Sequence, residues 1–165
     1  MLNNKKILIT GVANKFSIAT GIAKVMKGFG ASLAFTYQNE RLLRKVSSIA
    51  EELEVDTLIE CDVSSDESIY DAFQEIKTKW DSLDGIVHSI GSAPSDQLMG
   101  DFTEVTTREG FKIAHEISSY SFTALAKEAL PILNENSALL TLTYLGAIQS
   151  LPNYNVMGLA KASLC

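Results

Sequence analysis

The chain has 165 residues, of which 46% are hydrophobic and 21% charged, and its formal net charge is −6. These values are typical of one folded globular domain covering residues 1–165 and argue against disorder. An acidic surface repels polyanions, so nucleic acid and anionic membranes are not expected as partners. No apolar segment approaches the ~20 residues that span a bilayer. Two cysteines are too few for a disulfide framework and no signal sequence begins the chain, so we expect a reducing, cytoplasmic location.

Strand-like and helix-like segments alternate in the first half of the chain. The predicted strands are Lys6–Thr10, Ala31–Thr36, Thr57–Cys61 and Asp84–Ser89, and the predicted helices are Ser17–Phe29, Glu40–Leu53 and Asp66–Trp80. The third helix follows a capping-box spacing, S-x-x-E. This alternation predicts an α/β fold, a doubly wound parallel sheet with helices on both faces.

The second half of the chain begins with a long polar loop, Gly91–Val105, and a loop of that length is usually functional. A second capping-box spacing at 106–109 then predicts one long helix that ends near Leu130, just before a proline. Ser137–Thr143 is the fifth predicted strand. A final helical stretch follows Pro152.

The turn after the first strand lies where a doubly wound sheet binds the pyrophosphate of a dinucleotide. The usual G-x-G-x-x-G is absent, since Gly11 is followed six residues later by Ser17. A serine hydroxyl can donate to a phosphate. On these residues alone, an ordinary turn between strand and helix is an equally good interpretation.

Two positions at the ends of the second and third strands are candidates for binding adenosine. Gln38 stands where an acidic residue normally holds the ribose 2′-hydroxyl, and glutamine can also bond a hydroxyl. No arginine occupies that position, which favours NADH, although the nearby Arg41 keeps NADPH open. Asp62 and Val63 could contact the adenine edge, but capping of the next helix is an equal alternative for the aspartate.

Tyr154 and Lys161 are the strongest chemical signal in the sequence. Seven positions on an α-helix correspond to ~700°, so both side chains are expected on one face, two turns apart. An ammonium group close to a phenol favours the phenolate and makes the tyrosine a better donor to a developing oxyanion. Separately, each residue is more often a plain surface residue. Their occurrence together after a fifth strand favours a catalytic interpretation.

Tyr144 ends the fifth strand, at the sheet edge where ligands bind in open α/β folds, although it could equally cover the core. His88 and His115 lie in apolar or amphipathic segments without partners at ligand spacing. We therefore predict no metal site.

Several segments together resemble the bacterial NADH-dependent enoyl-[acyl-carrier-protein] reductases, which belong to the short-chain dehydrogenase/reductase superfamily. They are residues 11–19, 88–91, 107–115 (TREGFKIAH), 118–122, 143–147 and 152–164 (PNYNVMGLAKASL). The resemblance extends over the whole chain, and its Tyr-x6-Lys spacing is specific because most of the superfamily carries Tyr-x3-Lys. It implies a Rossmann-like domain that reduces trans-2-enoyl-acyl carrier protein with NADH in fatty acid elongation, as a homotetramer.

The resemblance also implies roles for individual residues. Gly11, Ser17 and Ile18 would contact the phosphate and nicotinamide-proximal part of NADH. Gln38 would bind the adenosine, and Asp62 and Val63 would bind the adenine. Ile90 would line the cofactor cleft, and Lys161 would bind the nicotinamide ribose. Tyr154 would bond the thioester oxygen, Tyr144 would line the acyl site as a second catalytic tyrosine, and Ala93 would touch the substrate.

Two features depart from the family. Ser92 replaces a bulky aromatic found in many relatives, which would alter the substrate pocket. The family also continues beyond Cys165, so the sheet is expected to lack its C-terminal strands, and a chain ending here is expected to be poorly folded or inactive. The alternatives are another short-chain carbonyl reductase and a truncated, non-catalytic nucleotide-binding module.

Overall fold

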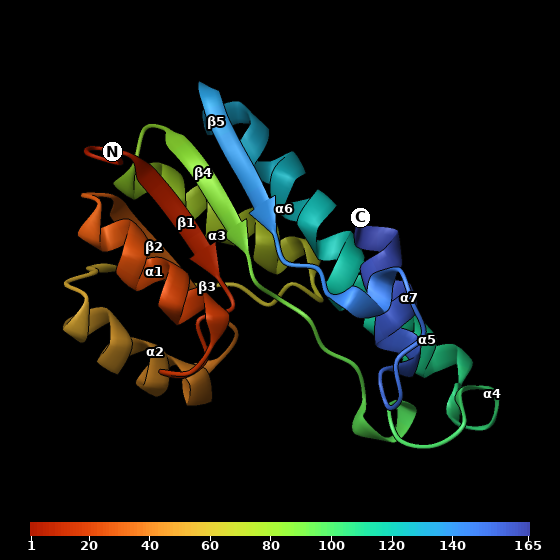
Figure 1. The fold of residues 1–165 in the computed structure, drawn as a ribbon. Helices are drawn as coiled ribbons and strands as arrows, with labels where there is room; N and C mark the ends of the chain where they lie inside the picture. The colour runs from red at the N-terminus through yellow and green to blue at the C-terminus, as the bar shows by residue number, and fades with distance from the viewer. The chain divides into compact units, whose positions relative to one another are not determined.

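A computed structural model describes residues 1–165 and contains a five-stranded parallel sheet (Figure 1). The strands are β1 (Lys6–Thr10), β2 (Ser32–Tyr37), β3 (Thr57–Glu60), β4 (Leu83–His88) and β5 (Leu133–Thr141). They are ordered β3-β2-β1-β4-β5, and every neighbouring pair is parallel. This is the strand order of dinucleotide-binding sheets. The α/β, Rossmann-like fold predicted from the sequence is confirmed.

The chain also contains seven α-helices. They are α1 (Ile18–Gly28), α2 (Glu40–Glu52), α3 (Asp66–Lys79), α4 (Phe102–Val105), α5 (Arg108–His115), α6 (Ser121–Ala129) and α7 (Asn155–Leu164). None of these helices has the length and apolar character needed to cross a lipid bilayer.

The chain forms two compact units. The first contains Met1–Ser89 and Leu125–Thr141 and holds the whole sheet. The second contains Ile90–Ala124 and Leu142–Cys165. The long loop predicted after the fourth strand belongs to the second unit, where it includes the short helix α4.

The core of the first unit follows from the alternation of side chains along its strands. Ile7, Ile9 and Phe35 are buried and belong to the cluster that also includes buried residues of α1 and α2. Successive residues of a strand point to opposite faces, so Leu8 and Ile86 face the other side of the sheet. Figure 1 shows α3 on that side, opposite α1 and α2. Both faces of the central strands are therefore covered, as apolar parallel strands require.

Asp84 ties together the amino-terminal ends of three strands in the first unit. Its carboxylate accepts hydrogen bonds from the Lys5 ammonium (2.8 Å), the Lys6 backbone N–H (2.9 Å) and the Asn134 amide (3.0 Å). Burial alone would raise the pKa of Asp84, but the hydrogen bonds from these three residues outweigh it and lower the pKa. The charged carboxylate therefore stabilises the folded state.

The long helix predicted to end near Leu130 is interrupted. A π-helical turn, Glu116–Tyr120, separates α5 from α6. The sequence gives no sign of it, because a π turn has no residue signature of its own and depends on what packs against it. The helix α3 begins at Asp66, as predicted, and its N-cap residue is Ser65. The N-cap residue of α5 is Thr107.

The second unit has a smaller core. Its buried members are Ala114, Val156, Met157 and Ala160, and Ala93 packs against them. The helix α7 packs on α5 and on the π turn. Ala114 of α5 and Ala160 of α7 are both fully buried in this core.

Candidate active site

Gly11 makes the turn that follows β1, and no other residue fits there. Its φ is +85°, a conformation that side-chain-bearing residues rarely adopt. A Cβ at this position would lie 2.0 Å from the carbonyl oxygen of Ser89, which follows β4. The glycine therefore lets the chain pass close to β4 at the carboxyl edge, where the strand order reverses and where open α/β sheets bind their ligands.

Ser17 is the N-cap residue of α1, but its hydroxyl is engaged locally. It donates to the carbonyl oxygen of Asn14 (2.8 Å) and lies 2.8 Å from the hydroxyl of Thr20. Ile18, the first helical residue, is 67% exposed. The seryl hydroxyl thus closes the turn, while the first turn of α1 presents backbone N–H groups and the positive end of the helix dipole.

Gln38 and Asp62 come together at the carboxyl ends of β2 and β3. The Gln38 amide donates to the Asp62 carboxylate at 3.2 Å. The Asp62 carboxylate also accepts from the N–H and the hydroxyl of Ser64 (3.0 and 2.8 Å). Burial would raise the pKa of Asp62, but hydrogen bonds from Ser64 and Gln38 lower it. Because Ser65 caps α3, the alternative that Asp62 is the N-cap of that helix is wrong. Val63, the next residue, is half-buried.

Lys161 is buried in the second unit, with only 6% of its surface exposed. Its ammonium donates to the carbonyl oxygens of Ile90 (3.1 Å) and Leu142 (2.9 Å). Burial lowers the pKa of Lys161, and a negative charge at Cys165 partly offsets that effect. An ammonium group has three donors, so these two carbonyls leave one proton for a ligand.

The ring of Tyr154 packs against another tyrosine. Its ring packs edge-on against Tyr144, with the ring centres 5.1 Å apart and an angle of 66° between the planes. Burial, and then the nearby Tyr144, raise the pKa of Tyr154, whereas the spacing of Tyr154 and Lys161 predicted that the ammonium would lower it. Tyr154 is the N-cap residue of α7, one position before the helix, so the helical periodicity does not place its side chain.

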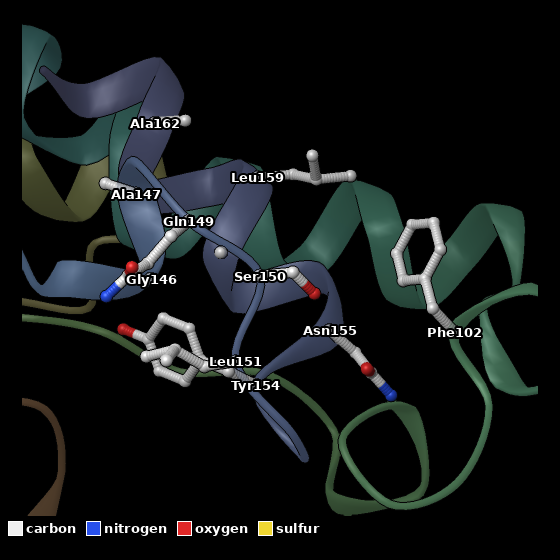
Figure 2. Close-up of a pocket in the computed structure, with 11 residues that line it drawn as sticks. Phe102, Gly146, Ala147, Gln149, Ser150, Leu151, Tyr154, Asn155, Leu159 and Ala162 are labelled. Atoms are coloured by element: carbon white, nitrogen blue, oxygen red, sulfur yellow. The ribbon is translucent and has the colours of Figure 1, made fainter.

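A pocket in the second unit lies beside this tyrosine (Figure 2). Its volume is about 300 Å³, and Phe102, Leu159 and Ala162 are among the side chains that line it. Figure 2 shows the hydroxyl end of Tyr154 on the side of Gly146, away from Phe102. The phenol therefore borders the pocket with its ring and directs its polar end elsewhere.

Gly146 and Gly158 were not singled out in the sequence, yet they set the position of Tyr154. A Cβ on Gly146 would lie 2.3 Å from the Tyr154 ring, and one on Gly158 would lie 2.9 Å from the Gly146 carbonyl oxygen. The sequence could have indicated them by their positions, because Gly146 lies two residues after Tyr144 and Gly158 lies three residues before Lys161.

The remaining predicted site residues lie in separate surroundings. Ile90 is half-buried and contributes its carbonyl to Lys161, and Ala93 is half-buried against the core of the second unit. Tyr144 is 56% exposed. His88 is fully buried, and its Nδ1 lies 2.8 Å from the Thr141 hydroxyl, in agreement with a structural role.

A model of the family described as "Enoyl-(Acyl carrier protein) reductase" matches residues 11–165. The chain belongs to this enoyl reductase family. The curated relatives include "Enoyl-[acyl-carrier-protein] reductase [NADH] FabI" of Escherichia coli (strain K12), which is 59% identical over 163 residues, or 99% of the chain. The chain spans 62% of the length of that enoyl reductase.

Solved structures of enoyl reductases have the same fold. The enzyme of Aquifex aeolicus VF5 superposes with a TM-score of 0.96 at 49% identity, over 99% of this chain and 65% of that one. The enzyme of Anaplasma phagocytophilum, solved in complex with NAD, superposes with a TM-score of 0.95 at 40% identity, over 99% of this chain and 62% of that one.

Proposed function

We propose that the protein reduces trans-2-enoyl-acyl carrier protein to acyl-acyl carrier protein with NADH, a step of fatty acid elongation. The observation that carries the proposal is the group formed by a buried Lys161 with one free donor and the Tyr144–Tyr154 pair in the same unit. Membership of the enoyl reductase family supports it, as does the name of the E. coli relative, which specifies NADH.

The residues of the first unit fit an adenosine diphosphate group. Gly11 lets the turn after β1 pass close to Ser89 at the carboxyl edge of the sheet. Ser17 and Ile18 stand at the start of α1, whose N–H groups suit a phosphate. The joined side chains of Gln38 and Asp62 offer amide and carboxylate groups to a ribose hydroxyl and an adenine edge, with Val63 beside them. No arginine side chain occupies the Gln38 position, which favours NADH over NADPH.

In the second unit, Lys161 would bind the nicotinamide ribose through its third proton, and Ile90 would border the cofactor. Ala93 and Tyr144 would contact the enoyl substrate. Bound NADH would supply the hydride.

Tyr154 would donate a hydrogen bond to the thioester oxygen of the substrate, where negative charge builds up during reduction. Burial raises the pKa of this phenol, so it keeps its proton at neutral pH and remains a hydrogen-bond donor. A donor aimed at a developing oxyanion accelerates such reactions by about 10²–10³-fold.

The test is NADH oxidation driven by a crotonoyl thioester, with identification of the product. We expect a saturated thioester from the wild type and a loss of turnover of about 10²-fold or more in Tyr154→Phe, with NADH affinity retained. Tyr70→Phe, which alters a half-exposed tyrosine of α3, is the matched control and should retain activity. A hydroxyacyl product would indicate a carbonyl reductase instead. NADH binding without turnover would indicate a non-catalytic module.

The proposal includes a cytoplasmic location and a homotetrameric assembly. Cys61 and Cys165 are both free thiols, in keeping with a reducing cytoplasm. The family resemblance suggests a homotetramer, in which both compact units of each chain would form one dinucleotide-binding domain. Light scattering would measure the assembly.

A further inference from the structure

Ser118 lies in the π-helical turn between α5 and α6 and is completely buried. Its hydroxyl makes two hydrogen bonds to the backbone of Ser92, which lies 26 residues earlier in the chain. It accepts from the N–H of Ser92 at 2.9 Å and donates to the carbonyl oxygen of Ser92 at 3.1 Å. One side chain therefore holds both backbone groups of a residue in the loop that follows β4.

The loop held in this way is the one that contacts Lys161. Ile90, two residues before Ser92, accepts a hydrogen bond from the Lys161 ammonium at 3.1 Å. Gly91 lies between them, and a Cβ there would be 3.4 Å from both the Lys161 nitrogen and the terminal methyl of Met157. The segment 90–92 thus lies directly against two side chains of α7. A shift of this segment would move the Ile90 carbonyl away from the ammonium.

Met157 of α7 also contacts Ser118 directly. Its sulfur lies 3.6 Å from the Ser118 hydroxyl, and it is one helical turn before Lys161 on α7. The π turn, the loop and α7 therefore meet at Ser118. π-Helical turns occur frequently at functional sites, where the widened turn changes which side chains face inward.

We infer that Ser118 is a positioning residue that fixes the loop 90–92 and thereby the ammonium group of Lys161. Its role in reduction rests on the proposed function, in which Lys161 binds the nicotinamide ribose. Ser118 acts only through the loop and Lys161, and its contacts are with the protein itself. Removing its hydroxyl removes both bonds to Ser92, so the Ile90 carbonyl is held less firmly against the ammonium.

The first test needs no enzymatic activity. Lysine reactivity toward acetic anhydride is measured by mass spectrometry in the wild type, Ser118→Ala and Ser121→Ala. Ser121 is also fully buried, and its hydroxyl donates within the helix to the carbonyl of Ile117 (2.7 Å), so it controls for the loss of a buried serine. Two lost hydrogen bonds predict about a tenfold increase in Lys161 labelling in Ser118→Ala alone. The exposed Lys112 serves as the internal reference.

Unchanged labelling of Lys161 in Ser118→Ala, or an equal increase in Ser121→Ala, would overturn the inference. If the alanine variant does not fold, Ser118→Cys replaces the hydroxyl with a weaker donor of similar shape. Its Lys161 labelling should then exceed that of the wild type severalfold, and equality would be the contrary result.

The second test measures the consequence for catalysis. With NADH and a crotonoyl thioester, Ser118→Ala should raise the KM for NADH about tenfold while kcat changes less, and Ser118→Thr, which restores the hydroxyl, should recover most of the loss. An inactive wild type would refute the proposed function, and the labelling result would still decide the role of Ser118. An active wild type with an unchanged KM in Ser118→Ala would refute the catalytic part of this inference.

Discussion

Replacing Gly11 with alanine tests whether the turn after β1 has the geometry described above. The substitution places a Cβ 2.0 Å from a backbone oxygen after β4, and it does so at a φ of +85°. The left-handed backbone costs ~1–2 kcal/mol for a side-chain-bearing residue, and forcing an atom into a packed site costs ~1–3 kcal/mol more. We expect Gly11→Ala to lower the free energy of unfolding by about 2–5 kcal/mol.

Gly21→Ala is the matched control. Gly21 lies inside α1, and a Cβ there would meet nothing within 4 Å. Alanine is favoured over glycine in a helix by ~1 kcal/mol, so this variant should be more stable than the wild type. Urea denaturation followed by circular dichroism measures both effects, which have opposite signs. A Gly11→Ala variant as stable as the wild type, or a loss of equal size in Gly21→Ala, would refute the argument from close approach.

Three further predictions follow from individual contacts. Asp84→Ala should cost ~2–4 kcal/mol at pH 7, since it removes three hydrogen bonds to a carboxylate. The pKa of Asp84 is lowered on folding, so its contribution is present above the unfolded pKa of about 4 and is lost as pH falls through the lower, folded value. Urea denaturation at several pH values should show the gap between variant and wild type closing in acid, and a constant gap would contradict this. Gly146→Ala should displace the ring of Tyr154 and lower turnover of a crotonoyl thioester more than it weakens NADH binding, whereas unchanged turnover would show that the ring moves freely. Asp62→Ala should weaken NADH binding about tenfold in a fluorescence titration, and an unaltered affinity would remove this residue from the proposed site.

The parallel sheet was predictable because its information is local. Each buried strand appears as a short apolar run and each helix as a periodic one, and their alternation restricts the connections to a parallel arrangement. Gly11, Gln38 and Asp62 could be singled out for the same reason, because the carboxyl ends of parallel strands meet at one edge. The direct bond between Gln38 and Asp62 is a consequence of that meeting.

The orientation of the Tyr154 side chain relative to Lys161 was harder to predict from the sequence. The spacing of Tyr154 and Lys161 suggested two side chains on one helical face, but α7 begins only at Asn155. Asn153, which precedes the helix, and Asn155, its first residue, adopt positive φ values of 59° and 35°, so the backbone on both sides of Tyr154 departs from helical geometry. Asparagine tolerates this conformation, but nothing in the sequence requires it here.

The sequence by itself determined the α/β class, the order of the elements, the glycine turn after β1 and the identity of the tyrosines and the lysine. Only the tertiary structure decided what those side chains contact. Lys161 is held by the carbonyl oxygens of Ile90 and Leu142, 71 and 19 residues away, and every residue type has such a carbonyl. Acceptors that all residues share leave no trace in the order of side chains, so their selection depends on how distant segments pack.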